Sequence, residues 1–143
     1  DLVRQMKGLF PNLHISVNGG ITSLEQAVEF LDGGLDGVMV GRAAYHQPSD
    51  ILSTADRRIY GTGTDTSAEE AVAGMLPYIE AHLTDGGRLH QVTRHMLGLF
   101  AGRPGARGWR RALSEGAHRD GAGPELVEQA LTHITQAAQA QSA

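Results

Sequence analysis

The sequence contains no cysteine among its 143 residues. This absence excludes disulfide bonds, thiolate zinc sites and a cysteine nucleophile within the chain. No apolar run approaches the ~20 residues that span a bilayer, and no signal peptide is present. We therefore expect a cytoplasmic, monomeric protein with no membrane partner. The sequence begins at Asp1 and not at a methionine. This indicates that the chain was processed or that its N-terminal part is missing.

Negative charge exceeds positive charge, with 16 acidic and 12 basic side chains. The basic residues are concentrated in the segment 88–119, which holds seven arginines and a single acid, Glu115. Such asymmetry favours a surface that meets a polyanion. A solvated helix face is the alternative for any charge run. Arginine supports the first interpretation, because its guanidinium group binds phosphate through two parallel hydrogen bonds.

The front of the chain predicts a strand, a helix and a second strand. Residues 14–17 form a β-prone run, and Ser23 followed by Gln26 resembles a capping box at the start of a helix over 24–31. Residues 37–40 are apolar, as expected of a strand buried on both faces. This order is typical of a βαβ unit in a parallel sheet.

The remainder predicts helices only. We expect one short helix over 48–60, a glycine-containing linker over 61–66, and a helical domain over 67–143, which leaves residues 1–60 as the first domain. Within the helical domain, Ser67 with Glu70 predicts a capping box, and Pro77 predicts a kink or a break. Further helices are expected over 89–100, over 106–115 and from Pro124 onward, with fraying after Gln136.

Both predicted strands end in residues suited to binding an anion. Asn18, Gly19 and Gly20 follow the first strand, and Gly41 and Arg42 follow the second. Glycine lets backbone amides approach a phosphate closely, a following helix adds its positive end, and Arg42 would clamp the anion. Glycines after strands also make ordinary tight turns, which is the alternative.

In a (β/α)₈ barrel the loops after strands 7 and 8 form the common phosphate site. If the two predicted strands are strands 7 and 8 of such a barrel, six strands should precede them. Only residues 1–13 precede them, which are too few for six strands. The fold class predicted here is therefore the C-terminal part of an α/β TIM barrel, strands 7 and 8 only, followed by an all-α domain.

The segment 106–115 predicts an arginine-bearing helix. Arg107, Arg110 and Arg111 lie at i, i+3 and i+4 and share one face, whereas Trp109 and Leu113 lie on another and are expected to pack inward. Such a helix suits an RNA backbone, and Arg88 and Arg94 would extend its basic surface. Pairing of these arginines with nearby acids is the alternative.

Two strings of residues resemble a known family. The first comprises Asn18-Gly19-Gly20-Ile21 and Asp36-Gly37-Val38-Met39-Val40-Gly41-Arg42. The second comprises Arg94-His95-Met96-Leu97-Gly98-Leu99-Phe100, Pro104-Gly105-Ala106-Arg107 and Trp109-Arg110-Arg111. Both are similar to the tRNA-dihydrouridine synthases, and the second resembles the helical tRNA-binding domain of bacterial subfamily A, which modifies D-loop uridines 20 and 20a.

The resemblance implies a flavoprotein oxidoreductase of tRNA processing. FMN would sit at the C-terminal face of a TIM barrel, NADPH would reduce it, and a cysteine would protonate the uracil ring. It also implies FMN-phosphate contacts from Asn18, Gly19, Gly20, Gly41 and Arg42. Arg107 and Arg110 match tRNA-contacting arginines of the family, whereas Arg111 is added on helix geometry alone.

The chain departs from this family pattern because it has no cysteine. We therefore expect no catalytic residue in it, and neither uridine reduction nor tight FMN binding by this chain alone. Seven histidines are scattered without carboxylate clusters, so no metal site is expected. Two alternatives remain open: a stand-alone RNA-binding module, and another phosphate-binding or FMN-dependent barrel oxidoreductase whose helical tail serves oligomerisation.

Overall fold

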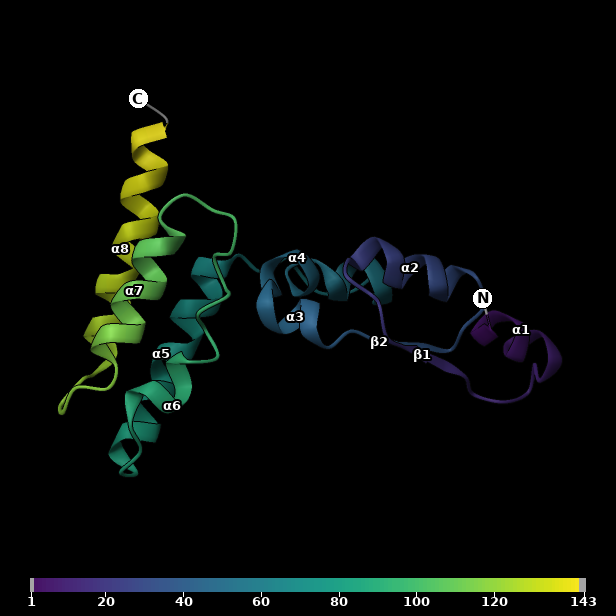
Figure 1. Cartoon of the computed structure of the whole chain (residues 1–143), viewed down its shortest axis with the longest axis horizontal. Coiled ribbons are helices and arrows are strands. Elements are labelled where there is room, and N and C mark those ends of the chain that lie inside the picture. Colours follow the sequence, from purple (N-terminus) through teal and green to yellow (C-terminus); the bar gives the residue numbers. More distant parts are fainter. Residues whose placement is uncertain (1, 142–143) are drawn as a thin grey trace. The chain divides into compact units, whose positions relative to one another are not determined.

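The computed structural model describes residues 2–141 of the chain and divides into two compact units between Asp65 and Thr66, inside the segment 61–66. The first unit contains α1 (Leu2–Leu9), β1 (Ser16–Asn18), α2 (Leu24–Asp32), β2 (Gly37–Met39), α3 (Arg42–His46), α4 (Pro48–Leu52) and the π-helical turn η1 (Asp56–Tyr60). The second contains α5 (Ala68–Thr84), α6 (Leu89–Thr93), α7 (Ala106–Gly116) and α8 (Pro124–Gln141) (Figure 1). No helix in the described part of the chain is long and apolar enough to cross a membrane.

The first unit contains the predicted βαβ arrangement. β1 and β2 are parallel neighbours, with Val17 opposite Val38 (Figure 1), and α2 connects them. The Ser23 side chain accepts a hydrogen bond from the Gln26 amide at 3.2 Å, which confirms the N-cap. The capping box itself is incomplete, because the Gln26 side chain accepts from the Thr22 amide instead.

The Asp36 carboxylate and the Lys7 ammonium link the starts of β1 and β2. The Asp36 carboxylate accepts a hydrogen bond from the Ile15 amide at 2.8 Å and pairs with the Lys7 ammonium at 2.7 Å. The Lys7 ammonium also donates to the carbonyls of Pro11 and Leu13. These two donors lower the pKa of Asp36 below its ordinary value, the Ile15 amide contributing most. The segment before β1 is thereby fastened to the residue before β2.

Some expectations for the first unit were wrong. β2 is not buried on both faces, since Met39 is 52% exposed and the sheet has only two strands among the described residues. The single helix expected over 48–60 is instead α4 followed by η1, and α3 precedes it. The wider π-helical turn lets Ile59 pack with Ala55 against the core around Val17.

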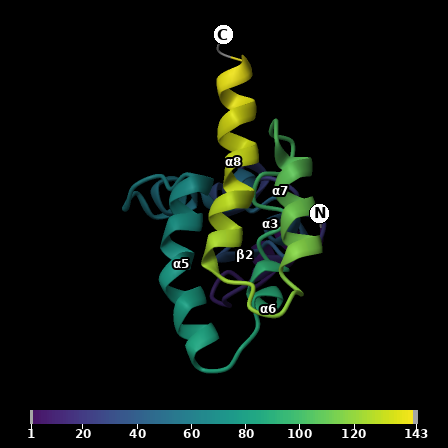
Figure 2. The ribbon, with the colours of Figure 1, turned by 90° about the vertical axis from the view of Figure 1, so that its left-hand side faces the viewer.

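The second unit is built around one apolar core. Figure 2 shows α8 between α5 and α7, with α6 near one end of the group. Trp109 and Phe100 are fully buried, and their rings meet edge to face with centroids 4.9 Å apart. The Trp109 indole N–H donates to the Met96 carbonyl at 3.1 Å, so the only polar atom of this side chain is satisfied inside the core.

The sequence predicted the start of α5 better than its interior. The capping box of Ser67 and Glu70 is present in full, which confirms that prediction. α5 continues through Pro77 without a break. Pro77 and Ala73, whose carbonyl loses its helical partner, both lie in an exposed part of the helix, where such a carbonyl is open to solvent.

The second helix of the helical domain is shorter than predicted. α6 ends at Thr93, and residues 94–102 follow as turns with i→i−3 hydrogen bonds, such as Met96 N to the Thr93 carbonyl. Met96 and Phe100 are nevertheless buried, as their spacing predicted. α8 remains helical to Gln141, so fraying from Gln136 is not observed; residues 142–143 lie outside the described part.

Three glycines allow α7 to approach α8 closely. A Cβ at Gly105 would overlap the His133 backbone carbonyl, and one at Gly108 would lie 2.6 Å from His133 Cγ. A Cβ at Gly116 would lie 2.7 Å from Leu126 Cδ2. Gly105 also has a φ of +85°, a conformation that side chains disfavour. The contact between these helices therefore requires glycine.

Candidate functional site

The two glycine-containing turns lie at one edge of the sheet. β1 and β2 run parallel with Asn18 opposite Met39, so both chains leave the sheet on the same side. Asn18, Gly19 and Gly20 continue from β1, whereas Gly41 and Arg42 come two and three residues after Met39. The structure thus brings together the five residues that the sequence singled out. This edge, at the carboxyl ends of parallel strands, is where ligands bind in open α/β sheets.

The backbone at this edge is open. Gly19 and Gly20 have φ values of +118° and +71°, and no atom lies within 4 Å of where their Cβ atoms would be. Gly41 has a negative φ, so its conformation does not require glycine. Arg42 is exposed and has no carboxylate partner among residues 2–141. The edge therefore offers exposed backbone and one cation, which fits a phosphate group.

The helix after the first turn contributes less than expected. The Gln26 amide, at the third position of α2, already donates to Ser23 Oγ. The Thr22 amide just before α2 donates to Gln26 Oε1 at 2.9 Å. Part of the positive end of α2 is thus satisfied by its own side chains. A phosphate at this edge would depend more on the glycine turn and Arg42 than on this helix.

The arginines of α7 are exposed as predicted, but they are not equivalent. Arg107 and Arg110 have no carboxylate partner among the described residues, whereas Arg111 Nε donates to Glu115 at 3.0 Å. Trp109 and Leu113, from the opposite side of the helix, are buried. Burial of these two side chains fixes the face on which Arg107 and Arg110 point outward.

Other arginines of the basic segment have structural partners. Arg103 donates to both carboxylate oxygens of Glu69 and lies over the Phe100 ring at 5.1 Å. The Arg103 guanidinium holds the pKa of Glu69 below its usual value. Arg94 Nε donates to His95 Nε2. Arg103 therefore stabilises the fold, and the basic segment divides into structural and outward-facing arginines.

The structure also places together residues that the sequence did not connect. His90 of α6 stacks on His118, with ring centroids 4.5 Å apart, and His90 Nδ1 is buried without a hydrogen-bond partner. Burial, and then the charges of His118, Arg88 and Arg94, lower the pKa of His90. No sequence signal links two histidines so far apart. No group of three metal-ligating side chains occurs among residues 2–141.

Comparison with known proteins agrees with the motifs. A family model described as "Dihydrouridine synthase (Dus)" matches residues 1–139. A protein of Shewanella oneidensis named tRNA-dihydrouridine(20/20a) synthase is 56% identical over 135 residues, which cover 94% of this chain and 40% of the relative. Proteins of the same name from Salmonella typhi and Escherichia coli K12 are 55% and 53% identical, covering 92% and 90% of this chain. The chain spans about two fifths of the length of these curated relatives.

Proposed function

Because the chain belongs to the dihydrouridine synthase family, we propose that it supplies the FMN-phosphate cradle and the tRNA-binding domain of a tRNA-dihydrouridine synthase. The whole enzyme would reduce the C5–C6 bond of D-loop uridines 20 and 20a, with NADPH as the reductant. Its proposed compartment is the cytoplasm, where tRNA is found. The observation that carries the tRNA assignment is the face of α7, where Arg107 and Arg110 point outward without carboxylate partners among the described residues.

In this proposal residues 1–60 are the last two strands of the FMN-binding barrel, 61–66 is a linker, and 67–143 is the RNA-binding domain. The open backbone of Gly19 and Gly20 supports an approach by phosphate. Asn18 and Gly41 flank that position on the two strands, and Arg42 neutralises the charge. Bound FMN would supply the hydride for the uracil ring; these residues only hold and orient its phosphate.

The chemical step requires groups that this chain does not contain. The family resemblance assigns proton donation to a cysteine, and the sequence has none. We therefore propose that the isolated chain does not reduce uridine and does not hold FMN tightly. Purified chain carrying stoichiometric flavin absorbance, or turning over unmodified tRNA, would contradict this.

The tRNA assignment is tested with a double variant, Arg107→Ala with Arg110→Ala. Each phosphate contact contributes about one unit to the slope of log affinity against log salt. We expect the double variant to lose about two units of slope and at least about tenfold in affinity for unmodified tRNA, because charge-assisted hydrogen bonds are among the strong ones. Fluorescence anisotropy across a salt series measures both quantities.

The matched control is Arg57→Ala with Arg58→Ala, which removes the same charge from the first unit. These arginines pair with Asp65 and Glu25, so neither is expected to contact RNA, and the slope should stay near that of the unmodified chain. Equal affinity and slope in the Arg107/Arg110 variant would overturn the assignment. That outcome would favour a barrel whose helical tail serves oligomerisation.

A further inference from the structure

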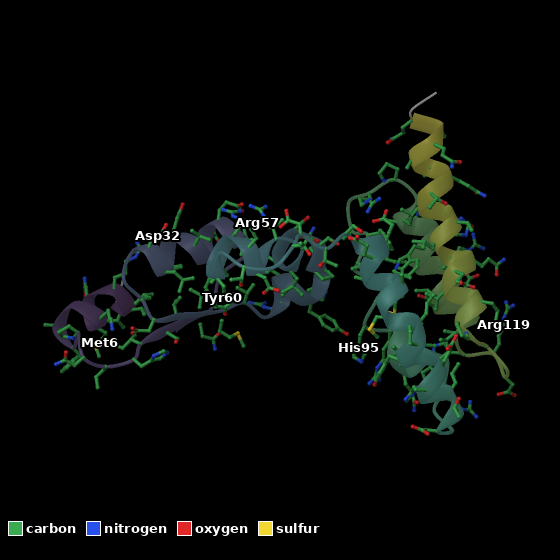
Figure 3. All side chains as sticks on the ribbon, turned by 180° about the vertical axis from the view of Figure 1, so that it is seen from behind. Met6, Asp32, Arg57, Tyr60, His95 and Arg119 are labelled. Atoms are coloured by element: carbon green, nitrogen blue, oxygen red, sulfur yellow. The ribbon has the colours of Figure 1, made fainter. Side chains whose placement is uncertain are left out.

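A cleft of about 410 Å³ opens at one end of the helical unit. It lies between the loop that joins α5 to α6 and the loop that joins α7 to α8, and Arg119 in the second loop is labelled in Figure 3. Gly86 and Gly121, one from each loop, line it, and no atom lies within 4 Å of where their Cβ atoms would be. The cleft is therefore accessible to a small polar group.

The charged groups of this cleft are mostly cationic. Arg88 comes from the first loop and Arg119 from the second, and Arg119 has no carboxylate partner among residues 2–141. Arg88 Nη1 lies 3.9 Å from Asp120 Oδ1, but their side chains are 67% and 98% exposed. An ion pair so exposed contributes little, so an incoming anion can replace Asp120 as the partner of Arg88.

One histidine lines this cleft and a second stacks on it. His118 lines the cleft and also a smaller hollow of about 90 Å³, which His90, Arg94 and Ser114 border. His90 Nδ1 in the stacked pair has no hydrogen-bond partner. The charged and titratable groups that lower the pKa of His90 are His118, Arg88 and Arg94, none of them a carboxylate. A bound anion would offset the positive charge of Arg88 and Arg94.

We propose that this cleft binds a phosphate group of an RNA backbone, with Arg88 and Arg119 as the charged contacts and His118 as a hydrogen-bond donor. The choice of RNA rests on the proposed function. The site differs from the outward face of Arg107 and Arg110, since it lies at the other end of α7. Arg107 lies near the start of α7 and His118 follows its end; the nine residue steps from Arg107 to Gly116 rise about 14 Å at about 1.5 Å each. An extended strand of a few nucleotides spans such a distance, so one strand can reach both sites.

Phosphate binding itself is tested by proton NMR of the histidine rings. Inorganic phosphate and uridine monophosphate are titrated separately into the whole chain at fixed pH and ionic strength, with His90→Gln and His118→Gln used to assign signals. We expect the ring signals of both histidines to shift on addition of either ligand. In Arg88→Ala with Arg119→Ala the shifts should disappear. Absent shifts in the unmodified chain, or unchanged shifts in the variant, would overturn the proposal.

RNA binding is tested with the same double variant by anisotropy on unmodified tRNA. The expected result is a loss of about two units of salt slope and at least about tenfold in affinity. Asp120→Asn should raise the affinity a few-fold, because it removes the competing carboxylate from Arg88. Arg57→Ala with Arg58→Ala again serves as the matched control of charge. Trp109 fluorescence and circular dichroism establish that each variant is folded.

The outcomes separate this inference from the proposed function. If the Arg107/Arg110 variant weakens tRNA binding and the Arg88/Arg119 variant does not, the cleft is not an RNA site and the proposed function stands. If only the Arg88/Arg119 variant weakens binding, the inference holds and the assignment of tRNA binding to Arg107 and Arg110 of α7 is overturned. If neither does, both are overturned.

Discussion

At the scale of single residues, arginines of one basic segment differ in what they do. Arg103 is held by Glu69 and by the Phe100 ring, whereas Arg107 and Arg110 are exposed with no carboxylate partner in the described part of the chain. Counting charge along the sequence could not make this distinction, because Glu69 lies 34 residues from Arg103. Arg111 is a weaker candidate than its neighbours because Glu115 already occupies it.

His90 makes the stability of the helical unit depend on pH. Its pKa is lowered from the ordinary 6.5, chiefly by burial and then by neighbouring positive charges. The unfolded chain therefore binds the proton more readily, and the free energy of unfolding falls as pH falls through about 6.5. We expect the urea midpoint, followed by Trp109 fluorescence, to decrease between pH 7.5 and 5.5. His90→Gln should make this decrease smaller.

His95→Gln is the control for this prediction, because it removes an exposed histidine of the same unit. Its urea midpoint should follow pH as that of the unmodified chain does. If His90→Gln and His95→Gln have the same pH dependence, the lowered pKa of His90 is not what links stability to pH.

At the scale of elements, the α7–α8 contact depends on missing side chains. Gly105→Ala adds a Cβ that overlaps the His133 carbonyl, at a φ of +85°. Strain of roughly 1–2 kcal/mol from the backbone and about 1–3 kcal/mol from overpacking should lower the free energy of unfolding. Urea unfolding followed by Trp109 fluorescence measures the loss.

Gly102→Ala is the matched variant. Gly102 also has a positive φ, +78°, but nothing lies within 4 Å of where its Cβ would be. Its free energy of unfolding should fall only by the backbone strain, roughly 1–2 kcal/mol. Equal losses of unfolding free energy at the two positions would show that the close contact between Gly105 and α8 does not affect stability.

The elements that the sequence predicted best are those with local chemical signals. Ser67 with Glu70 marked the start of α5. The glycine-containing turns after β1 and β2 were predictable for the same reason. The break that Pro77 allowed for does not occur, because α5 continues through it. α1 was not predicted, although Leu2, Met6 and Leu9 have helical spacing. All three side chains are exposed, and no residue of α1 is fully buried.

Contacts that depend on tertiary packing could not be predicted from the sequence. The stacking of His90 on His118 requires α6 and the end of α7 to meet, and neither residue belongs to a recognisable motif. The turns over 94–102 keep the buried spacing of a helix without being one, because Met96 and Phe100 face the core from i→i−3 turns. Apolar spacing predicts which side chains are buried more safely than it predicts backbone conformation.

At the scale of the whole molecule, the two units have unequal cores. The buried cluster of the second unit includes Trp109, Phe100 and Ile79, whereas that of the first consists of Val17, Ile21, Leu24, Ala27 and Leu35. Large apolar side chains such as Leu9 and Tyr60 are exposed in the first unit. Since buried apolar area is the main favourable term in folding, the first unit should be the less stable one.

This difference predicts two unfolding transitions in urea. Trp109 is the only tryptophan of the chain and reports on the second unit, whereas far-ultraviolet circular dichroism reports on helices of both. Part of the dichroism should be lost at lower urea than the Trp109 fluorescence change, and the rest should coincide with that change. Superimposable curves from the two probes would show instead that the units unfold as one cooperative structure.

The pairing of Lys7 with Asp36 has a consequence for strand alignment. Together with the hydrogen bond from the Ile15 amide to Asp36, it joins the strands at the edge opposite the glycine turns. A slip of one residue between β1 and β2 would turn Val17 out of the core and move Asn18 and Gly41 out of step. The alignment of the proposed phosphate cradle is thus set in part from the far end of the sheet, by Lys7 and Asp36.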